Sequence, residues 1–372
     1  MASLRWASTL RRGGTVNATG IPTRPQDIDP GWLTEALSER RRGVRVSEVT
    51  VLDEHELTNN HAMLGVRYGE QSDLPATMFC KLAPLDPARR DAIIASGMGL
   101  REARFYDSLA PLLSLRVPVA YVARYGEDGR FVLLLEDLES SGCRLPDGTW
   151  GIAPDAAAVA LSELAQFHLR YLDETRRRHE LSWLPVGRHN SAYAAPMLRY
   201  GIDHHRDELS DHFVELAECY IAQPEVLHEL WRRGPHTALH GDPHIGNLFD
   251  DHGRIGFLDW GIMNISTPMR DVSYFINLGL SIDDRRNHER DLLGHYLEIW
   301  NSQSGARITF DQAWLAHRIQ AAYLVTACCQ IVTFPPDATE RRRVLAGAFL
   351  ARAEAAIADL DTHTAVLQNL GC

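Results

Sequence analysis

The sequence predicts an α+β protein of two lobes, with a β-rich N-terminal half and a mainly helical C-terminal half. Its 372 residues are more than one compact domain usually holds. Before residue 136 apolar residues alternate at strand spacing in several runs, and from residue 155 onward they recur at helical spacing. We therefore expect an N-terminal extension over 1–28, a first lobe over 29–138 and a second lobe over 139–372.

The first lobe is expected to combine a short helix with an antiparallel meander. Trp32, Leu33, Ala36 and Leu37 fall on one face of that helix. Gly- and Pro-containing turns separate the runs that follow. In chain order the predicted elements are a helix at 29–42, strands at 46–52, 62–68 and 77–82, a helical segment at 87–113, and a strand pair at 119–124 and 131–135.

The second lobe is predicted to be helical apart from one short β segment. This segment consists of strands at 247–249 and 254–258, joined by Asp250-Asp251-His252-Gly253, which has the composition of a hairpin turn. The residues on either side of this segment include the candidates for catalysis and metal binding. The predicted helices lie at 156–171, 194–222, 290–300, 311–331 and 340–360.

The composition limits the class of partner. The chain has 38 Lys and Arg against 49 Asp and Glu, a net charge of -11. Because nucleic-acid phosphates require a basic face, we expect no nucleic-acid partner and favour a neutral or cationic one. No run approaches the roughly 20 apolar residues that span a bilayer, so we expect no membrane contact. The six cysteines form no Cys-x-x-Cys pair, which favours reduced thiols in a cytoplasmic protein.

One segment leaves a different location open. Residues 1–26 hold four Arg, several Ser and Thr and no acidic residue. Transit peptides share this composition. An organelle therefore remains the alternative to the cytoplasm.

Lysine occurs once in the chain. Of the 38 basic residues 37 are Arg, and Lys81 is the exception. A single ammonium in an Arg-rich sequence indicates a position that requires a compact point charge with three donors, which a planar guanidinium does not provide. Chance survival of one lysine is the alternative reading of this composition.

Two motifs flank the short β segment. Residues 240–247 read His-Gly-Asp-Pro-His-Ile-Gly-Asn, and eleven residues later Asp259-Trp260-Gly261 follows. His-x-Asp-x4-Asn is the layout of the protein-kinase catalytic loop, and Asp-x-Gly after a hairpin is its second metal element. Phosphoryl transfer requires a carboxylate at the nucleophile and hard oxygen ligands for the metal. Asp242, Asn247 and Asp259 would supply these groups.

Asp and Asn are common in loops, so the first motif alone is a weak signal. A second observation strengthens it. Lys81 lies on a predicted strand, and Glu102 follows 21 residues later on a helical segment. A strand lysine and a helix glutamate form the ion pair that positions nucleotide phosphates in kinases.

With these motifs the sequence resembles the kinase-like small-molecule phosphotransferases, which include aminoglycoside phosphotransferases, choline kinases and ecdysteroid-kinase-like proteins. The resemblance covers roughly residues 30 to 350. It implies a two-lobed protein-kinase-like fold with a nucleotide-binding N-lobe and a C-lobe that holds the catalytic loop and an acceptor pocket. The matching segments are 102–106, which look most like the ecdysteroid-kinase-like branch, 133–138, 164–168, 240–247, 257–261 and 270–275.

The resemblance also implies roles for single residues. Asp242 would be the catalytic base, and Asn247 and Asp259 would bind Mg²⁺. Lys81 with Glu102 would position the phosphates of ATP, and the backbone from Glu136 to Leu138 would contact adenine. Asp271 would brace the catalytic loop, and His240 would be structural. The implied activity is Mg²⁺-dependent transfer of the γ-phosphate of ATP to a hydroxyl of a small molecule.

One segment departs from the family pattern. The phosphate-covering loop of kinases is Gly-rich, whereas residues 56–62 contain no glycine. Asn59 and Asn60 are the residues here that tolerate a left-handed turn. A catalytically silent pseudokinase, which binds nucleotide or a protein partner, is therefore the alternative function. A protein kinase is disfavoured, because no Ala-Pro-Glu element follows Gly261.

Other clusters have simpler readings. His240 and His244 have i, i+4 spacing but lie in a Gly- and Pro-containing loop without the Glu that a His-Glu-x-x-His zinc site requires at its second position, so we expect no zinc there. His204, His205 and His212 are expected to be solvated helix or loop residues, although they fall where this family builds its acceptor pocket. Cys328 and Cys329 lie within an apolar helical run and are expected to be buried.

Overall fold

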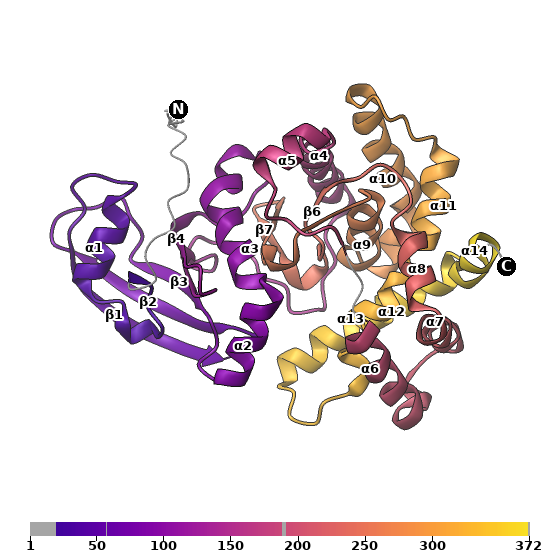
Figure 1. Ribbon diagram of the computed structural model, residues 1–372, viewed down its shortest axis with the longest axis horizontal. Coiled ribbons are helices and arrows are strands. Elements are labelled where there is room, and N and C mark those ends of the chain that lie inside the picture. Colours follow the sequence, from indigo (N-terminus) through magenta and orange to yellow (C-terminus); the bar gives the residue numbers. More distant parts are fainter. Residues whose placement is uncertain (1–19, 57, 188–190, 371–372) are drawn as a thin grey trace. The chain divides into compact units, whose positions relative to one another are not determined.

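The computed structural model of the protein describes residues 20–56, 58–187 and 191–370. Backbone contacts divide the chain into two compact units. The first consists of Met1–Leu112 and Val119–Asp137, and the second of Leu113–Pro118 and Leu138–Cys372. The first unit is built on a sheet and the second is mainly helical (Figure 1), which confirms the predicted α+β class. Of the expected N-terminal extension, residues 1–19 lie outside the described residues.

The first unit contains a five-stranded antiparallel sheet. The three strands of the predicted meander and the predicted strand pair are all present, and the strand order is β1-β2-β3-β5-β4. Strand β3 is central, so both of its edges are hydrogen-bonded to neighbouring strands. The strands are β1 (Val46–Glu56), β2 (Asn60–Tyr68), β3 (Thr77–Leu82), β4 (Ala120–Tyr125) and β5 (Phe131–Glu136).

The two faces of this sheet carry different side chains. Cys80 pairs with Leu134, and both are fully buried in the core cluster that also contains Leu33 of helix α1 (Pro30–Ser38). Side chains alternate along a strand, so Lys81 and its partner Leu133 face the opposite side. Helix α3 (Met98–Arg104) packs against β4 and β5.

Helix α1 begins where the sequence predicts and ends earlier. The Asp29 side chain caps it by accepting a hydrogen bond of 2.7 Å from the Trp32 N–H. The predicted helix ran to residue 42, whereas the observed one ends at Ser38.

The helical segment predicted over 87–113 is interrupted. Helix α2 (Pro87–Ser96) ends at Gly97, which has φ of +69°. Glycine enters this left-handed region without steric cost, so the chain changes direction there and starts α3. A π-helical turn at Phe105–Leu109 follows. The sequence pattern missed the break because apolar spacing continues across it.

The second unit holds the predicted helices and several further elements (Figure 1). The segment predicted as one helix over 194–222 forms two, because the Ser210 side chain caps a new helix by accepting from the Phe213 N–H at 3.3 Å. The segment at 311–331 also forms two. These helices are α4 (Pro154–Arg170), α6 (Ser191–His204), α7 (Asp211–Ala222), α10 (Ile282–Gln303), α11 (Phe310–Gln320), α12 (Tyr323–Ala327) and α13 (Glu340–Asp359).

The short β segment is confirmed as a hairpin of β7 (Leu248–Asp251) and β8 (Arg254–Phe257). His252 and Gly253 in its turn have φ of +52° and +91°, as a two-residue hairpin turn requires. The elements that the sequence pattern did not predict are short or, like α9 (Met269–Gly279), almost wholly buried. They are α5 (Glu174–Glu180), α8 (Pro224–Trp231), β6 (Thr237–Leu239), β9 (Asn264–Ser266), α9 (Met269–Gly279) and α14 (Thr362–Asn369).

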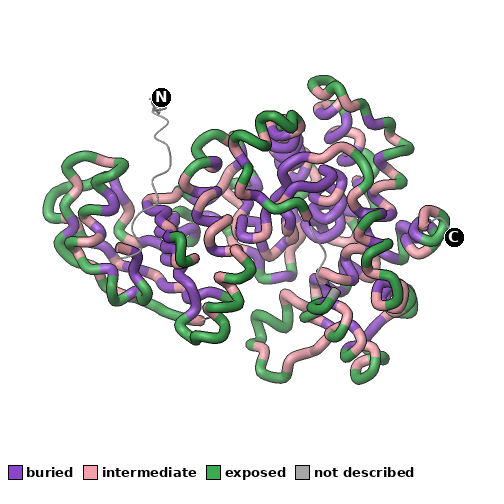
Figure 2. The backbone as a smooth tube through the Cα atoms, in the orientation of Figure 1, coloured by how far each residue is buried: buried purple, intermediate pink, exposed green. Residues whose placement is uncertain are grey.

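Helix α9 lies at the centre of the second unit. All but one of its residues are buried, and Figure 2 shows the surrounding helices with their inner faces buried as well. Cys328 and Cys329 are buried as free thiols, which confirms that expectation. None of the described helices is both long and apolar enough to cross a membrane.

The packing of α3 on the sheet yields a stability prediction. A Cβ atom on Gly99 would lie 2.1 Å from Cε1 of Phe131, so Gly99→Ala should destabilise the protein by about 1–3 kcal/mol through overpacking. Gly294 lies in α10 with no atom within 4 Å of an added Cβ. As the control, Gly294→Ala should stabilise by about 0.5–1 kcal/mol. Urea unfolding followed by circular dichroism compares them, and a Gly99→Ala variant as stable as wild type would contradict this packing.

Candidate active site

The loop between β6 and β7 brings Asp242 and Asn247 together. The Asn247 Nδ2 group donates to the main-chain carbonyl of Asp242 at 3.0 Å and to its Oδ2 atom at 3.1 Å. Because a carbonyl oxygen only accepts, the amide nitrogen must be the atom that faces Asp242. The Asn247 Oδ1 atom is thereby left as the group that can bind a cation.

His244 lies beside the Asp242 carboxylate. The His244 Nδ1 atom accepts from the Gly246 N–H at 2.9 Å, so the proton of a neutral ring is on Nε2, which lies 3.4 Å from Asp242 Oδ2. Burial raises the pKa of Asp242, but interactions with His244 and Tyr274 more than offset it, and the pKa lies below its ordinary value. The Asp242 side chain is 28% exposed. It is therefore an ionised carboxylate that solvent can reach.

His240 connects this loop to the segment that carries Asp259. It is fully buried, and its Nδ1 atom accepts from the Asp242 N–H at 3.2 Å. Its Nε2–H then donates to the Leu258 carbonyl at 3.1 Å. Burial lowers the pKa of His240, which keeps the ring neutral as this pattern requires. The Leu258 N–H in turn donates to the Asn247 carbonyl at 2.9 Å, so both metal-ligand candidates share one hydrogen-bonded frame.

Asp259 has an unusual backbone conformation. Its φ of +59° is in the left-handed region, which costs a non-glycine residue energy and is typical of functional positions. A 3₁₀ turn at Trp260–Ile262 follows it. Trp260 is fully buried with its ring 4.3 Å from that of His240, so it packs against this histidine. At Gly241 a Cβ atom would lie 2.6 Å from the Ile262 carbonyl oxygen, so the two loops touch directly.

Asp271 holds the start of the loop that carries Asp242 and Asn247. This fully buried carboxylate, in the first turn of α9, accepts from the N–H of His240 at 2.7 Å and of Gly241 at 3.0 Å. His168 of α4 lies 3.3 Å from the same carboxylate. The bracing position that the resemblance implies for Asp271 is therefore confirmed.

The first unit brings Lys81 and Glu102 together. The Lys81 Nζ atom lies 2.6 Å from Glu102 Oε2, and the two side chains are 6% and 3% exposed. A buried ammonium requires such a partner, because desolvation of an unpaired charge is costly. The ion pair joins β3 to α3, as the spacing in the sequence predicts.

Glu136 and Leu138 lie at the end of β5 and just beyond it. The Glu136 N–H donates to the Val119 carbonyl at 2.8 Å, and the Leu138 carbonyl accepts from the Cys143 N–H at 2.9 Å. Among the described residues no acceptor is found for the Leu138 N–H. The side chain of Leu138 packs with Cys143 and Phe249.

The glycine-poor turn differs from expectation. Neither Asn59 nor Asn60 adopts the left-handed conformation considered for them, since positive φ outside glycine occurs among the described residues only at four other positions. Both are buried, and the Asn60 Nδ2 group donates to Glu54 Oε1 at 2.9 Å. Their Oδ1 atoms are buried without a hydrogen bond in the described structure.

Sequence reasoning missed two residues beside Asp242. His244 was considered only as a metal ligand, and Tyr274 only as part of a matching segment. Both interact with the carboxylate of Asp242. The position of His244 two residues after Asp242 was an available signal, whereas no spacing rule relates Tyr274 to a loop 32 residues earlier.

Comparison with known proteins gives a consistent result. A family model described as "Phosphotransferase enzyme family" matches residues 71–307. A choline kinase from Cryptosporidium parvum is 10% identical with a TM-score of 0.53, covering 92% of this chain and 96% of its own. Choline kinase LicA from Streptococcus pneumoniae is 14% identical with a TM-score of 0.47 and coverages of 88% and 98%.

A macrolide 2'-phosphotransferase from Brachybacterium faecium is 18% identical with a TM-score of 0.43, covering 85% of this chain and 97% of its own. No protein in the curated set matches the chain. The likeness to the Cryptosporidium parvum structure shows the fold, and that fold is the predicted two-lobed protein-kinase-like one.

The brace at Asp271 predicts a stability effect. Asp271→Asn replaces one accepting oxygen by an NH₂ group, which leaves a buried N–H of His240 or Gly241 without an acceptor. We expect a loss of about 1–3 kcal/mol in the free energy of unfolding. Asp283→Asn is the control, because the Asp283 side chain is 91% exposed, and it should stay within about 0.5 kcal/mol of wild type. Equal effects in urea unfolding would show that Asp271 is no brace.

Proposed function

Because the chain belongs to the phosphotransferase enzyme family, we propose that it transfers the γ-phosphate of Mg²⁺-bound ATP to a hydroxyl group of a small molecule. The observation that carries the proposal is the ionised Asp242 carboxylate. Asn247 donates a hydrogen bond to this carboxylate, and Asp271 accepts from the backbone at the start of the same loop. Phosphoryl transfer is catalysed mainly by positioning and by charge stabilisation, and this loop is built for positioning.

Asp242 would accept the proton of the attacking hydroxyl. Its pKa lies below the ordinary value, so it is a weak base, and its main contribution is to orient the hydroxyl toward phosphorus. His244 and Tyr274 limit the orientations of the carboxylate by approaching it from its own loop and from α9.

Asn247 and Asp259 would hold Mg²⁺. The residues present fit this ion, since they offer an amide oxygen turned away from Asp242 and a carboxylate, both hard oxygen ligands. When bound, Mg²⁺ neutralises charge on the β- and γ-phosphates. The link from His240 to Leu258 and from Leu258 to Asn247 fixes the two ligand segments relative to each other.

Nucleotide binding would use two further groups of residues. The Lys81 ammonium, held by Glu102, would contact phosphate oxygens. The segment from Glu136 to Leu138 would contact adenine through its backbone. The Glu136 N–H is used inside the sheet, so we assign the Leu138 N–H as the donor to the base.

Substitution of the loop residues tests the proposal. Asp242→Asn keeps the shape of the side chain and removes the proton acceptor, so turnover should fall by about 10²–10⁴ while ATP affinity changes little. Asp259→Asn should weaken Mg²⁺-dependent ATP binding about tenfold or more. The assay is Mg²⁺-dependent ATP consumption with a panel of hydroxylated compounds, including aminoglycosides, macrolides, choline, sugars and steroids.

The same panel of compounds distinguishes the proposed phosphotransferase from the alternative, a catalytically silent pseudokinase. Full turnover in Asp242→Asn would refute the assigned role of Asp242. ATP binding by the wild-type protein without consumption across the panel would favour the silent pseudokinase, an alternative that the glycine-poor turn keeps open. Asp283→Asn, an exposed carboxylate change in α10, is the matched control.

A double-mutant cycle tests the Lys81–Glu102 pair. Lys81→Met leaves a buried carboxylate unpaired, so we expect a loss of about 3–5 kcal/mol in stability together with a raised KM for ATP. The double variant Lys81→Met/Glu102→Leu should recover most of the stability, because no charge is left unpaired, but not the KM. Recovery of both quantities would mean that the pair is only structural.

A further inference from the structure

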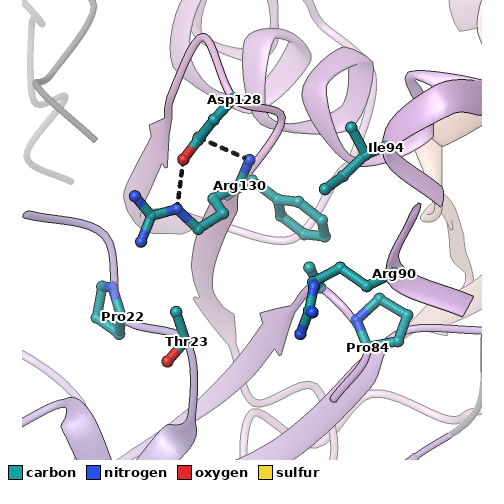
Figure 3. A pocket seen from close by; sticks show the side chains of 9 residues that line it. Pro22, Thr23, Pro84, Arg90, Ile94, Asp128 and Arg130 are labelled. Atoms are coloured by element: carbon teal, nitrogen blue, oxygen red, sulfur yellow. Dashed lines mark hydrogen bonds and ion pairs between the residues drawn. The ribbon is translucent and has the colours of Figure 1, made fainter. Parts of the chain in front are cut away.

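The first unit contains a pocket that the proposed reaction does not use. It has a volume of about 260 Å³ and is lined by residues of three segments. These are the chain before α1, the loop after β3 with helix α2, and the turn between β4 and β5. Figure 3 shows Pro22 and Thr23 on one side and Pro84 and Ile94 on the other, with the Arg90 side chain extending toward the space between them and the Arg130 side chain paired with Asp128.

The charge of this pocket is positive. Arg90 donates to the Leu85 carbonyl at 3.3 Å, and no carboxylate of the described residues forms an ion pair with it. The Arg130 Nε–H donates to Asp128 Oδ2 at 2.6 Å. The lining of the pocket thus holds two guanidinium groups and one carboxylate, in a chain whose net charge is -11. A guanidinium without a counter-charge is suited to a carboxylate or a phosphate.

Apart from Thr23, the rest of the wall is apolar. Phe131, Ile94, Pro22 and Pro84 present ring and aliphatic carbon to the pocket. Its volume is below the roughly 300–1,000 Å³ of pockets for drug-sized ligands. The occupant would accordingly be a molecule of about one ring.

Close packing holds the pocket in its shape. Gly129 has φ of +79°, and a Cβ atom there would lie 2.6 Å from Cγ2 of Ile94, so the turn between β4 and β5 touches α2. On another side the ring of Phe131 contacts Gly99 of α3. Pockets preformed in this way bind small ligands at a low cost in conformational entropy.

We propose that this pocket binds a small ring compound that carries one carboxylate or phosphate group. The anion contacts Arg90, and the ring lies against Phe131 and Ile94. None of these residues belongs to the proposed catalytic set, so binding here is a property separate from phosphoryl transfer.

Methyl NMR of the full chain tests the site directly. The Ile94 methyl signal, assigned by its loss in Ile94→Val, is followed while benzoate, phenyl phosphate or benzamide is added. We expect a shift of this signal by an anionic probe, with a dissociation constant on the order of 1 mM or lower. Benzamide is the neutral isostere of benzoate and should bind about tenfold more weakly.

Two variants locate the binding. Arg90→Gln should weaken binding of the anionic probes about tenfold. Arg67→Gln is the matched control, because Arg67 lies on β2 with its side chain 80% exposed and paired with Glu48, and it should leave binding unchanged. The preferred anion, carboxylate or phosphate, is given by whichever probe binds more tightly.

Three results would overturn the proposal. The first is an Ile94 signal that neither anion shifts at concentrations up to about 20 mM. The second is equal binding of benzamide and benzoate, which would remove the anion from the recognition. The third is an Arg90→Gln protein that binds as wild type does.

Discussion

The carboxylate of Asp271 is the constraint on which the candidate catalytic loop depends. It is fully buried and accepts two successive backbone N–H groups at the start of the loop. A buried charge is stable only when its hydrogen-bonding capacity is used, so the loop cannot leave Asp271 without a large cost. Helix α9, buried on nearly all sides, gives this carboxylate a fixed position. The geometry of the candidate catalytic residues thus derives from the centre of the second unit rather than from its surface.

A series of single hydrogen bonds connects this loop to the second motif. His240 links the candidate catalytic loop to Leu258, and the next residue is Asp259. The base candidate and both metal-ligand candidates therefore belong to one hydrogen-bonded group, although the first and the last are separated by 16 residues of sequence. In the first unit a buried charge also fixes the position of a side chain, but there an ion pair connects β3 to α3. In both units a costly buried charge fixes the position of a candidate functional residue.

Sequence patterns predicted much of the fold and of the candidate site, and the predictions that failed did so for identifiable physical reasons. Strands and hairpin turns were found because alternation and turn chemistry are local signals, and Lys81 with Glu102 was found because a lone lysine is conspicuous. Helix breaks at Gly97 and before Ser210 were missed, since apolar spacing continues through them. The interaction of Tyr274 with Asp242 was not predictable, because only the fold brings α9 to that loop. The roles of Glu136 and Leu138 still rest on the resemblance.

Because the folded protein requires a neutral His240, the stability of the fold depends on pH. Because burial lowers its pKa, the unfolded chain takes up a proton on this ring at a higher pH than the folded chain does. The contribution of His240 to stability is therefore complete above the ordinary histidine pKa of about 6.5 and declines as the pH falls below that value. A protonated ring would have no acceptor for the Asp242 N–H. Protonation of His240 would thus loosen the connection between the two loops, because the ring would no longer accept from the backbone of one loop while donating to that of the other.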